Sequence, residues 1–283
     1  VLLKLGPVLG SGTSGDVSPL LGAIDQGRYA IKQVRPKKGE DGDEQAKPMD
    51  HILHEVRLHR LCSEECSQVV RYAFSYMADE CLTVVMEACD SDLWDALTGG
   101  EDVWKRLLPG APPDVSERPP HREKLAMTAE LCRAVRHCHA LRVLHRDISP
   151  WNVFIVRRSG SGCRLGARLG DFGMAAQLPA DVETLQGIGA NDAIDLDESA
   201  LGSLYSAPEL GQTYGFPADV FSLGMTLLAL WIAPDCFDDA DGLTTVVEAA
   251  KTAAMEGSAQ QAPRQSWAPG PRQAGHAGSS PGE

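Results

Sequence analysis

Apolar residues follow two different periods along the chain, and the change of period separates strands from helices. Short apolar runs bounded by turn residues predict strands at 2–9, 29–34, 69–76 and 81–87. The run at 81–87 is nearly all apolar, which is typical of a strand buried on both faces. Apolar side chains at helical spacing predict one helix among these strands, carrying Ile52, Leu53, Val56, Leu58 and Leu61. The first third of the chain is therefore expected to be β-rich.

The rest of the chain has mainly helical patterns. They predict helices at 92–97, 125–141 and around 220–233, with one strand at 153–156. Residues 220–233 form an uncharged apolar run of 14 residues. A membrane span needs about 20, so this run predicts a buried core helix and no membrane span. Polar or Gly- and Pro-rich stretches at 36–50 and 99–121 are expected to be surface insertions.

Charge and cysteine content restrict the class of protein. The 283 residues carry a formal net charge of −13. Because an acidic surface disfavours phosphate backbones, no nucleic-acid partner is expected.

The eight cysteines are scattered without a CxxC pair, and Cys62 and Cys66 are expected to be ordinary helix residues. No signal peptide is visible, so we expect an intracellular protein, cytoplasmic or nuclear. Since the chain begins at Val1 and not at Met, we expect a fragment or a trimmed chain.

A glycine-rich segment near the N-terminus precedes a turn and a strand. Glycine lets the backbone approach phosphate groups closely and adopt positive φ. A helix after such a segment would indicate a dinucleotide-binding fold, whereas the strand that follows here indicates a hairpin lid over a nucleotide. Taken alone, the segment would be better explained as a flexible hairpin loop. Its candidate nucleotide-binding residues are Gly10, Ser11, Gly12, Thr13, Ser14, Gly15 and Val17.

The strand predicted at 29–34 supports the nucleotide hypothesis. Alternation places Ala30 and Lys32 on the same face. A small residue leaves room for an adenine ring, and a lysine can reach the α and β phosphates. An exposed strand lysine is the alternative, and the preceding glycine-rich segment favours the functional interpretation. Glu55 follows Lys32 by 23 positions, inside the predicted helix.

Residues 145–152, with the sequence His-Arg-Asp-Ile-Ser-Pro-Trp-Asn, carry the candidate catalytic chemistry. Asp147 can orient and deprotonate a substrate hydroxyl, and Asn152 can bind a metal ion five positions later. Asp171, in the tripeptide Asp-Phe-Gly, supplies a second carboxylate downstream. With Lys32 and the glycine-rich segment, this set is the apparatus of phosphoryl transfer from a nucleotide.

In these motifs and their order the chain resembles the eukaryotic protein kinases, of the Ser/Thr type, over roughly residues 2–232. It also contains Ala-Pro-Glu at 207–209, which small-molecule kinases of related fold generally lack. The resemblance implies an α+β, bilobal fold, with a β-rich lobe at 1–88 and a helical lobe at 89–256 that lacks its last helices. Residues 257–283 are rich in Gly, Pro, Ala and Gln and are expected to form a disordered tail.

The resemblance implies transfer of the γ-phosphate of ATP to a Ser or Thr hydroxyl of a protein substrate, with Mg²⁺ as cofactor. Lys32, held by Glu55, would orient the phosphates. Asn152 and Asp171 would hold the magnesium ion. Asp147 would accept the hydroxyl proton.

Five more positions take roles from the same resemblance. Met86 would guard the back of the adenine pocket. Backbone groups of Glu87, Ala88 and Cys89 would bind the adenine edge. Asp219 would bind the backbone of the catalytic loop (145–152), although an Asp near a helix start can also be an ordinary cap.

Two further interpretations concern the catalytic loop's surroundings. Arg146 would pair with a phosphorylated residue of the activation segment (174–201). Thr184 and Ser199 are candidates, but an ordinary surface hydroxyl explains either of them better. An isolated His-x-His pair on a helix places its rings on different faces, so His139 is expected to be a packing residue.

The chain departs from the family pattern at Ser149, where Ser/Thr kinases carry a lysine that touches the transferring phosphate. We therefore expect a slow kinase. One residue fewer than usual separates Gly202-Ser203 from Tyr205, which leaves the substrate-docking register open. The alternative function is a nucleotide-binding pseudokinase that serves as a scaffold. The complete set of Lys32, Asp147, Asn152 and Asp171 disfavours it.

Overall fold

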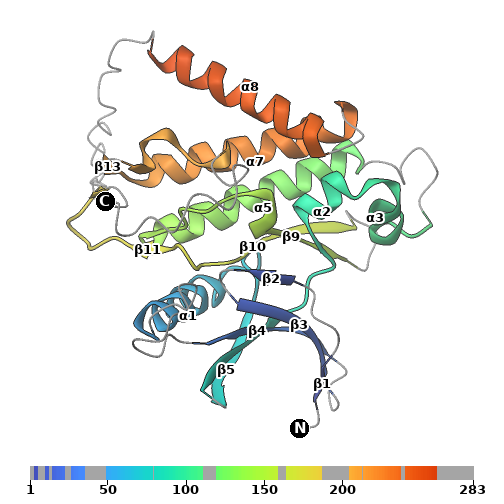
Figure 1. The fold of residues 1–283 in the computed structure, drawn as a ribbon, viewed down its shortest axis with the longest axis vertical. Helices are drawn as coiled ribbons and strands as arrows, with labels where there is room; N and C mark the ends of the chain where they lie inside the picture. The colour runs from blue at the N-terminus through green and yellow to red at the C-terminus, as the bar shows by residue number, and fades with distance from the viewer. Residues whose placement is uncertain are drawn as a thin grey trace, which may run out of the picture.

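The computed structural model describes residues 3–5, 10–12, 15–22, 27–35, 49–78, 80–110, 119–158, 164–186, 204–211, 213–236 and 240–259. Within these ranges the chain forms a β-rich N-terminal lobe and a mainly helical C-terminal lobe (Figure 1). The α+β, two-lobe arrangement expected from the sequence is thus confirmed. No helix in the described ranges is both long and apolar enough to cross a membrane.

An antiparallel sheet forms the N-terminal lobe. Its order is β1-β3-β4-β6-β5, and β2 pairs with β3 outside this path. The strands are Leu3–Leu5 (β1), Gly10–Gly12 (β2), Gly15–Gly22 (β3), Arg28–Val34 (β4), Tyr72–Ala78 (β5) and Cys81–Glu87 (β6). Because β6 lies between β4 and β5, the residues from Cys81 to Val85 are buried, in agreement with their apolar sequence.

The helix α1 (Met49–Ser63) packs on this sheet. Ile52 and Val56, one turn apart, form an apolar cluster with Val34 and Val84 of β4 and β6. Glu55 lies between these two helix positions and is 9% exposed. The amphipathic pattern of α1 therefore places Glu55 next to β4, although 23 positions separate it from Lys32.

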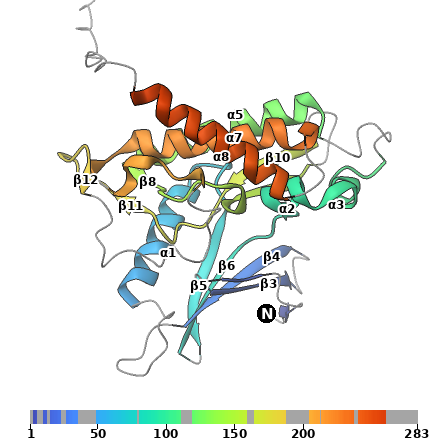
Figure 2. The ribbon, with the colours of Figure 1, turned by 45° about the horizontal axis from the view of Figure 1, so that its top comes forward.

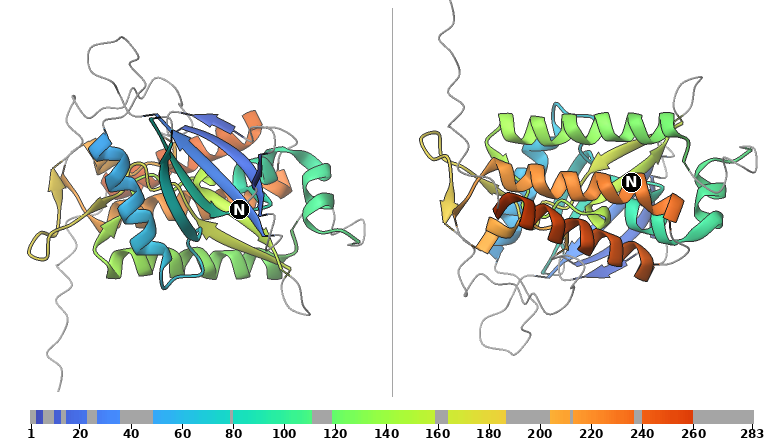
Figure 3. Two further views of the ribbon diagram at one scale, coloured as in Figure 1. Left: turned by 90° about the horizontal axis from the view of Figure 1, so that it is seen from below. Right: turned by 90° about the horizontal axis from the view of Figure 1, so that it is seen from above.

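Helices make up most of the C-terminal lobe. They are Leu93–Thr98 (α2), Gly100–Leu107 (α3), His121–Ala140 (α5), Phe216–Cys236 (α7) and Ala240–Ala259 (α8). The three long helices α5, α7 and α8 lie side by side in that order (Figure 3). The middle position of α7 explains its apolar sequence, and Leu223, Met225 and Leu230 are buried as predicted.

Most of the short strands lie on the side of the helical layer that faces the N-terminal lobe, whereas β12 and β13 lie beside the start of α7 (Figures 1 and 2). They form the sheet β10-β9-β7 and the pairs β11-β8 and β12-β13. Their bounds are Ser91–Asp92 (β7), Val143–Leu144 (β8), Val153–Arg157 (β9), Leu165–Leu169 (β10), Ala176–Gln177 (β11), Leu185–Gln186 (β12) and Thr213–Tyr214 (β13). The described residues also form the 3₁₀ helices η1 (Pro150–Asn152) and η3 (Pro208–Gly211).

The largest apolar cluster joins the two lobes. It includes Leu58 and Cys62 near the end of α1, Leu131 and Cys138 of α5, and Phe172, all 1% exposed or less. Contacts of this kind fix the end of α1 against the C-terminal lobe, while its start packs on the sheet. The cluster thereby sets where Glu55 stands relative to Phe172 and its neighbour Asp171.

Two predictions about these elements are wrong. The stretch 99–121 is not only a surface insertion, since it contains α3 and buries Trp104, Leu107 and Leu108 to 2% exposure or less. Because glycine and proline flank this helix, its short apolar pattern was not recognised in the sequence. The strand expected at 69–76 begins only at Tyr72, because Val69 and Val70 pair with Leu169 of the C-terminal lobe instead of with the N-terminal sheet. Residues 36–48 and 111–118 lie outside the described ranges.

Candidate functional site

Lys32 forms two ion pairs, one within the N-terminal lobe and one across to the C-terminal lobe. Its Nζ lies 2.5 Å from Oε1 of Glu55 and 3.2 Å from Oδ1 of Asp171. Burial alone would lower the pKa of Lys32, but the carboxylates of Asp171 and Glu55 outweigh this effect and raise it to about 12. The lysine therefore stays charged inside the protein. The structure brings these three predicted residues together from β4, α1 and the segment after β10.

The backbone around Asp171 is tightly constrained. A Cβ added at Gly170 would lie 2.8 Å from a ring carbon of Phe154 and 2.9 Å from a methyl group of Val70, so only glycine fits there. Asp171 itself adopts φ of 56°, a left-handed conformation that an L residue rarely takes. Its Oδ1 also accepts a hydrogen bond from the Gly173 amide at 3.1 Å. These constraints aim the carboxylate at Lys32.

Asp147 and Asn152 are joined directly. Asn152 Nδ2 donates to the carbonyl oxygen and to Oδ2 of Asp147, both at 2.8 Å. The Gly170 amide donates to the carbonyl of Asn152 at 2.9 Å, which ties the catalytic loop to the residue before Asp171. Carboxylate and amide oxygens are the ligands that Mg²⁺ prefers. Asp171 and Asn152 thus fit the donor set for a magnesium ion.

Asp219 of α7 binds the backbone of the catalytic loop. It is 1% exposed, and its carboxylate accepts hydrogen bonds from the amides of His145 and Arg146 at 2.9 and 2.8 Å. Burial would raise the pKa of Asp219, but these bonds and one from the side chain of His139 hold it below its ordinary value. The predicted contact of Asp219 with the loop backbone is confirmed.

His139 does more than pack. Its ring contacts Phe216 at 4.7 Å between centroids, as a packing histidine would, but its Nε2 also lies 2.8 Å from Oδ2 of Asp219. The expectation of a packing residue alone was therefore incomplete. Its position on the last turn of α5, six residues before the catalytic loop, is the sequence signal that could have revealed this bond.

A cavity of about 570 Å³ opens beside the Lys32 ion pairs. Of the predicted nucleotide-site residues, it is lined by Val17, Ala30, Lys32, Glu55, Met86, Glu87, Cys89 and Asp171. The glycine-rich segment forms the expected hairpin, since β2 pairs with β3 from Gly10 opposite Val17 to Gly12 opposite Gly15. Thr13 and Ser14 lie outside the described ranges. A nucleotide-sized space therefore coincides with the predicted adenine and phosphate positions.

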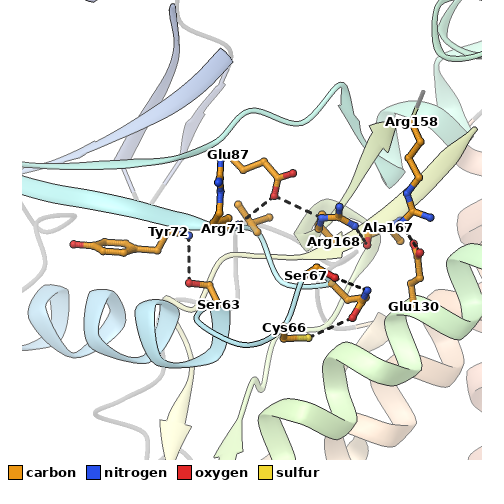
Figure 4. A network of polar contacts seen from close by, with 12 residues as sticks. Ser63, Cys66, Ser67, Arg71, Tyr72, Glu87, Glu130, Arg158, Ala167 and Arg168 are labelled. Atoms are coloured by element: carbon orange, nitrogen blue, oxygen red, sulfur yellow. Dashed lines mark hydrogen bonds and ion pairs between the residues drawn. The ribbon is translucent and has the colours of Figure 1, made fainter. Parts of the chain in front are cut away.

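The connection between the lobes is fixed by polar contacts (Figure 4). Glu87 Oε2 accepts a bond from the Arg71 amide at 3.3 Å and lies 3.6 Å from Nε of Arg168. The Glu87 amide donates to the Arg71 carbonyl at 2.9 Å. Burial raises the pKa of the Cys89 thiol to about 12, so it is not a reactive thiolate.

Several residues that line the cavity were not predicted from the sequence to be site residues. Asp92 lines the cavity and caps α2 by accepting a bond from the Asp95 amide at 2.7 Å. Burial raises the pKa of Asp92 to about 6. His59 and Trp151 also line the cavity. Asp92 and His59 belong to no motif with a fixed spacing, so only the fold brings them to the site, whereas Trp151 lies inside the segment 145–152 without having been singled out there.

The guanidinium of Arg146 is engaged by protein groups. It donates to the Met174 carbonyl and, at 2.8 Å, to the hydroxyl of Tyr214. Arg146 also has positive φ, at 67°. The candidate phosphosite Thr184 is exposed, and Ser199 lies outside the described ranges. Pairing of Arg146 with a phosphorylated residue stays a prediction.

A family model described as "Protein kinase domain" matches residues 3–273. The chain is 26% identical over 235 residues to the "Probable serine/threonine-protein kinase KIN28 homolog" of Encephalitozoon cuniculi (strain GB-M1), covering 82% of this chain and 59% of the relative. It is 26% identical over 225 residues to "Serine/threonine-protein kinase Nek5" of Homo sapiens, covering 78% and 27%. A third similar protein is "Serine/threonine-protein kinase zyg-8" of Caenorhabditis elegans, 32% identical over 130 residues, covering 45% and 15%. The chain thus spans 59% or less of the length of these relatives.

Proposed function

The chain belongs to the protein kinase family, and we propose that it transfers the γ-phosphate of ATP to a Ser or Thr hydroxyl of a protein substrate. The observation that carries this proposal is the ion-paired Lys32 facing Asp171 inside a nucleotide-sized cavity. The names of the relatives support the Ser/Thr class. A buried lysine and two carboxylates are costly to desolvate and serve a scaffold poorly, whereas phosphoryl transfer uses all of them.

Residues of the cavity have separate roles in binding the nucleotide. Lys32 binds the α and β phosphates, and Glu55 keeps its ammonium group in place through the 2.5 Å pair. Ala30 leaves room for the adenine ring, and Met86, its partner on the adjacent strand, also lines the cavity. Asp171 and Asn152 would hold Mg²⁺, which when bound neutralises charge on the β and γ oxygens.

The catalytic half rests on Asp147. Its carboxylate orients the substrate hydroxyl and accepts the proton as the oxygen attacks the γ-phosphorus. The bond between the phosphorus and the β–γ bridging oxygen then breaks, and ADP leaves. The two bonds from Asn152 Nδ2 hold Asp147 in one orientation, which lowers the entropic cost of aligning the hydroxyl.

A nucleotide-binding scaffold is the second candidate, and Ser149 is the observation that favours it. Ser149 is 3% exposed and places no charge where kinases of this type have a lysine. Under this alternative the cavity binds nucleotide, but no phosphate is transferred.

Transfer of labelled phosphate from ATP to a generic protein substrate separates the two functions. We expect slow transfer by the chain, and a loss of at least about 10²-fold in the Asp147→Asn variant, which should still bind ATP. The exposed Asp181→Asn serves as a matched control. Equal transfer by the parent and Asp147→Asn would reject the role of Asp147. Nucleotide binding without any transfer by the parent would favour the scaffold.

A further inference from the structure

The described part of the activation segment, residues 174–186 (the anchored stretch), has little secondary structure of its own. It contains β11, which pairs with β8, and β12, which pairs with β13, and each pair joins two residues to two. Strand pairs this short are marginally stable alone. Side chains from outside the stretch must therefore help to hold it.

Arg146 of the catalytic loop connects the two ends of the anchored stretch. Its guanidinium donates to the carbonyl oxygen of Met174, at the start of the stretch, and at 2.8 Å to the hydroxyl of Tyr214. Tyr214 belongs to β13 and lies opposite Leu185 of β12, near the end of the stretch. A single side chain next to the proposed base Asp147 thus links both ends.

Tyr214 is itself fixed by the core of the C-terminal lobe. It is 2% exposed, and its side chain packs in an apolar cluster with Leu144, Leu178 and Ala218, which are all buried. This packing determines where the hydroxyl lies. A hydrogen bond from a charged donor is about twice as strong as one between neutral groups. Tyr214 can therefore hold the Arg146 side chain in one orientation.

A second arginine, Arg142, holds the middle of the anchored stretch. Its Nε donates to the carbonyl oxygen of Pro179 at 3.1 Å, and its guanidinium also donates to the carbonyl oxygen of Val182. The backbone carbonyl of Arg142 accepts a bond from the Leu178 amide at 2.8 Å. Val182 packs against the same apolar cluster that contains the tyrosine. All of these contacts use unmodified groups of the chain.

A phosphate on the anchored stretch would meet groups that are already engaged. Because phosphate oxygens bind a guanidinium through paired hydrogen bonds, a phosphate at Arg146 would compete with the hydroxyl of Tyr214. Thr184, the candidate phosphosite that the structure describes, is exposed and directly follows Glu183. The Glu183 carboxylate lies 3.8 Å from Arg142. A phosphate on Thr184 would add like charge beside that carboxylate.

We propose that Tyr214 is a positioning residue that acts through Arg146 and holds the activation segment in its working position without a phosphate. The bond from Tyr214 fixes Arg146, whose chain neighbour Asp147 is the proposed base. Through Arg146 it also fixes Met174, which stands three residues after Asp171. The inference rests on the proposed kinase function and adds a regulatory property to it: transfer does not depend on phosphorylation of the activation segment.

The variant Tyr214→Phe, which removes only the hydroxyl, tests the positioning role. All forms are freed of phosphate with a protein phosphatase, checked by mass spectrometry and assayed by initial rates. We expect kcat to fall by about tenfold, because a bond to a charged group is lost, while the KM for ATP stays unchanged because Tyr214 does not line the cavity. In an Arg146→Met background the same change should have no further effect on kcat. Tyr76→Phe, in the 44% exposed tyrosine of β5, is the matched control and should keep the parent kcat.

The regulatory part is tested on the parent chain. Freed of phosphate, it should keep the initial rate that it has after incubation with ATP, and Thr184→Ala should match it. A large loss of rate on removal of phosphate, restored by incubation with ATP, would overturn the proposal. A Tyr214→Phe variant as fast as the parent would overturn it as well.

Hydrogen–deuterium exchange of residues 174–186 reports the anchoring without any activity. In the phosphate-free Tyr214→Phe variant these amides should exchange about tenfold faster than in the parent, and in Tyr76→Phe they should not. Equal exchange in all three forms would contradict the anchoring role, and thermal melting shows that each variant folds. Faster exchange in Tyr214→Phe, together with no transfer by the parent in any state, would reject the kinase function and leave the anchoring standing.

Discussion

Ser149 is the residue at which one substitution is expected to raise the rate of phosphate transfer. A lysine there would set a positive charge against the γ-phosphate, where negative charge develops in the transition state. Loss of one such donor typically costs about 10²–10³-fold in rate. We expect Ser149→Lys to raise kcat by at least about tenfold with little change in the KM for ATP, because the gain arises in the transition state. Steady-state kinetics at saturating MgATP measure it.

The matched control for this change is Ser149→Met, which adds a long side chain without the charge. Since Ser149 is 3% exposed, both variants must displace neighbouring atoms, and only the lysine variant should gain rate. A lysine variant no faster than the parent would show that another cation already serves the transferring phosphate.

His59 should make stability depend on pH. Burial lowers its pKa to about 4, from 6.5 in an unfolded chain. Between these values the unfolded state binds a proton that the folded state does not, so stability falls as the pH drops from 6.5 towards 4. From pH 7 to pH 5 the chain should lose about 2 kcal/mol through this group. Urea unfolding at both pH values should show that His59→Leu avoids this loss and that the exposed His51→Leu does not.

At the scale of elements, the meeting of α5 and α7 positions the catalytic loop. His139 near the end of α5 bonds Asp219 at the start of α7, and Asp219 bonds two loop amides. His139→Ala should lower kcat, leave the KM for ATP nearly unchanged, and cost about 1–3 kcal/mol of stability, because a buried carboxylate loses a donor. His139→Asn, which restores a donor, should recover part of kcat. If His139→Ala lost stability but kept its kcat, the hydrogen bond between His139 and Asp219 would have a structural role only.

The sequence predicts an element or a site residue well where neighbouring residues determine it, and poorly where packing between distant elements determines it. α1 and β6 follow from periodicity, and Lys32 and Glu55 follow from spacing within known motifs. α3 was missed because eight residues between glycine and proline give too short a pattern. Trp151 was missed as a site residue because Trp94 and Tyr205, whose rings contact it, lie 57 positions before it and 54 positions after it. Such positions depend on packing between elements, which one sequence does not encode locally.

At the scale of the whole molecule, the cavity lies between the two lobes. Lys32 and Val17 line it from the sheet, while Trp151 and Asp171 line it from the C-terminal lobe. A nucleotide bound there contacts both lobes, so it should stabilise the whole folded chain and not one lobe alone. At a concentration 100 times Kd this amounts to about 2.7 kcal/mol, or about 5 °C in Tm for a chain of this size.

The Asp171→Ala variant separates the contribution of the metal from that of the nucleotide. Because Lys32 keeps its pair with Glu55 at 2.5 Å, the variant should fold. It should lose the part of the MgATP-induced rise in Tm that depends on magnesium, since only Asn152 remains as a predicted ligand. Melting curves with ATP and EDTA, with MgATP, and with neither give the two contributions, and Asp181→Ala is the exposed-carboxylate control. If Asp171→Ala kept the full magnesium-dependent rise, the metal would have to bind elsewhere, and the role of Asp171 would reduce to holding Lys32.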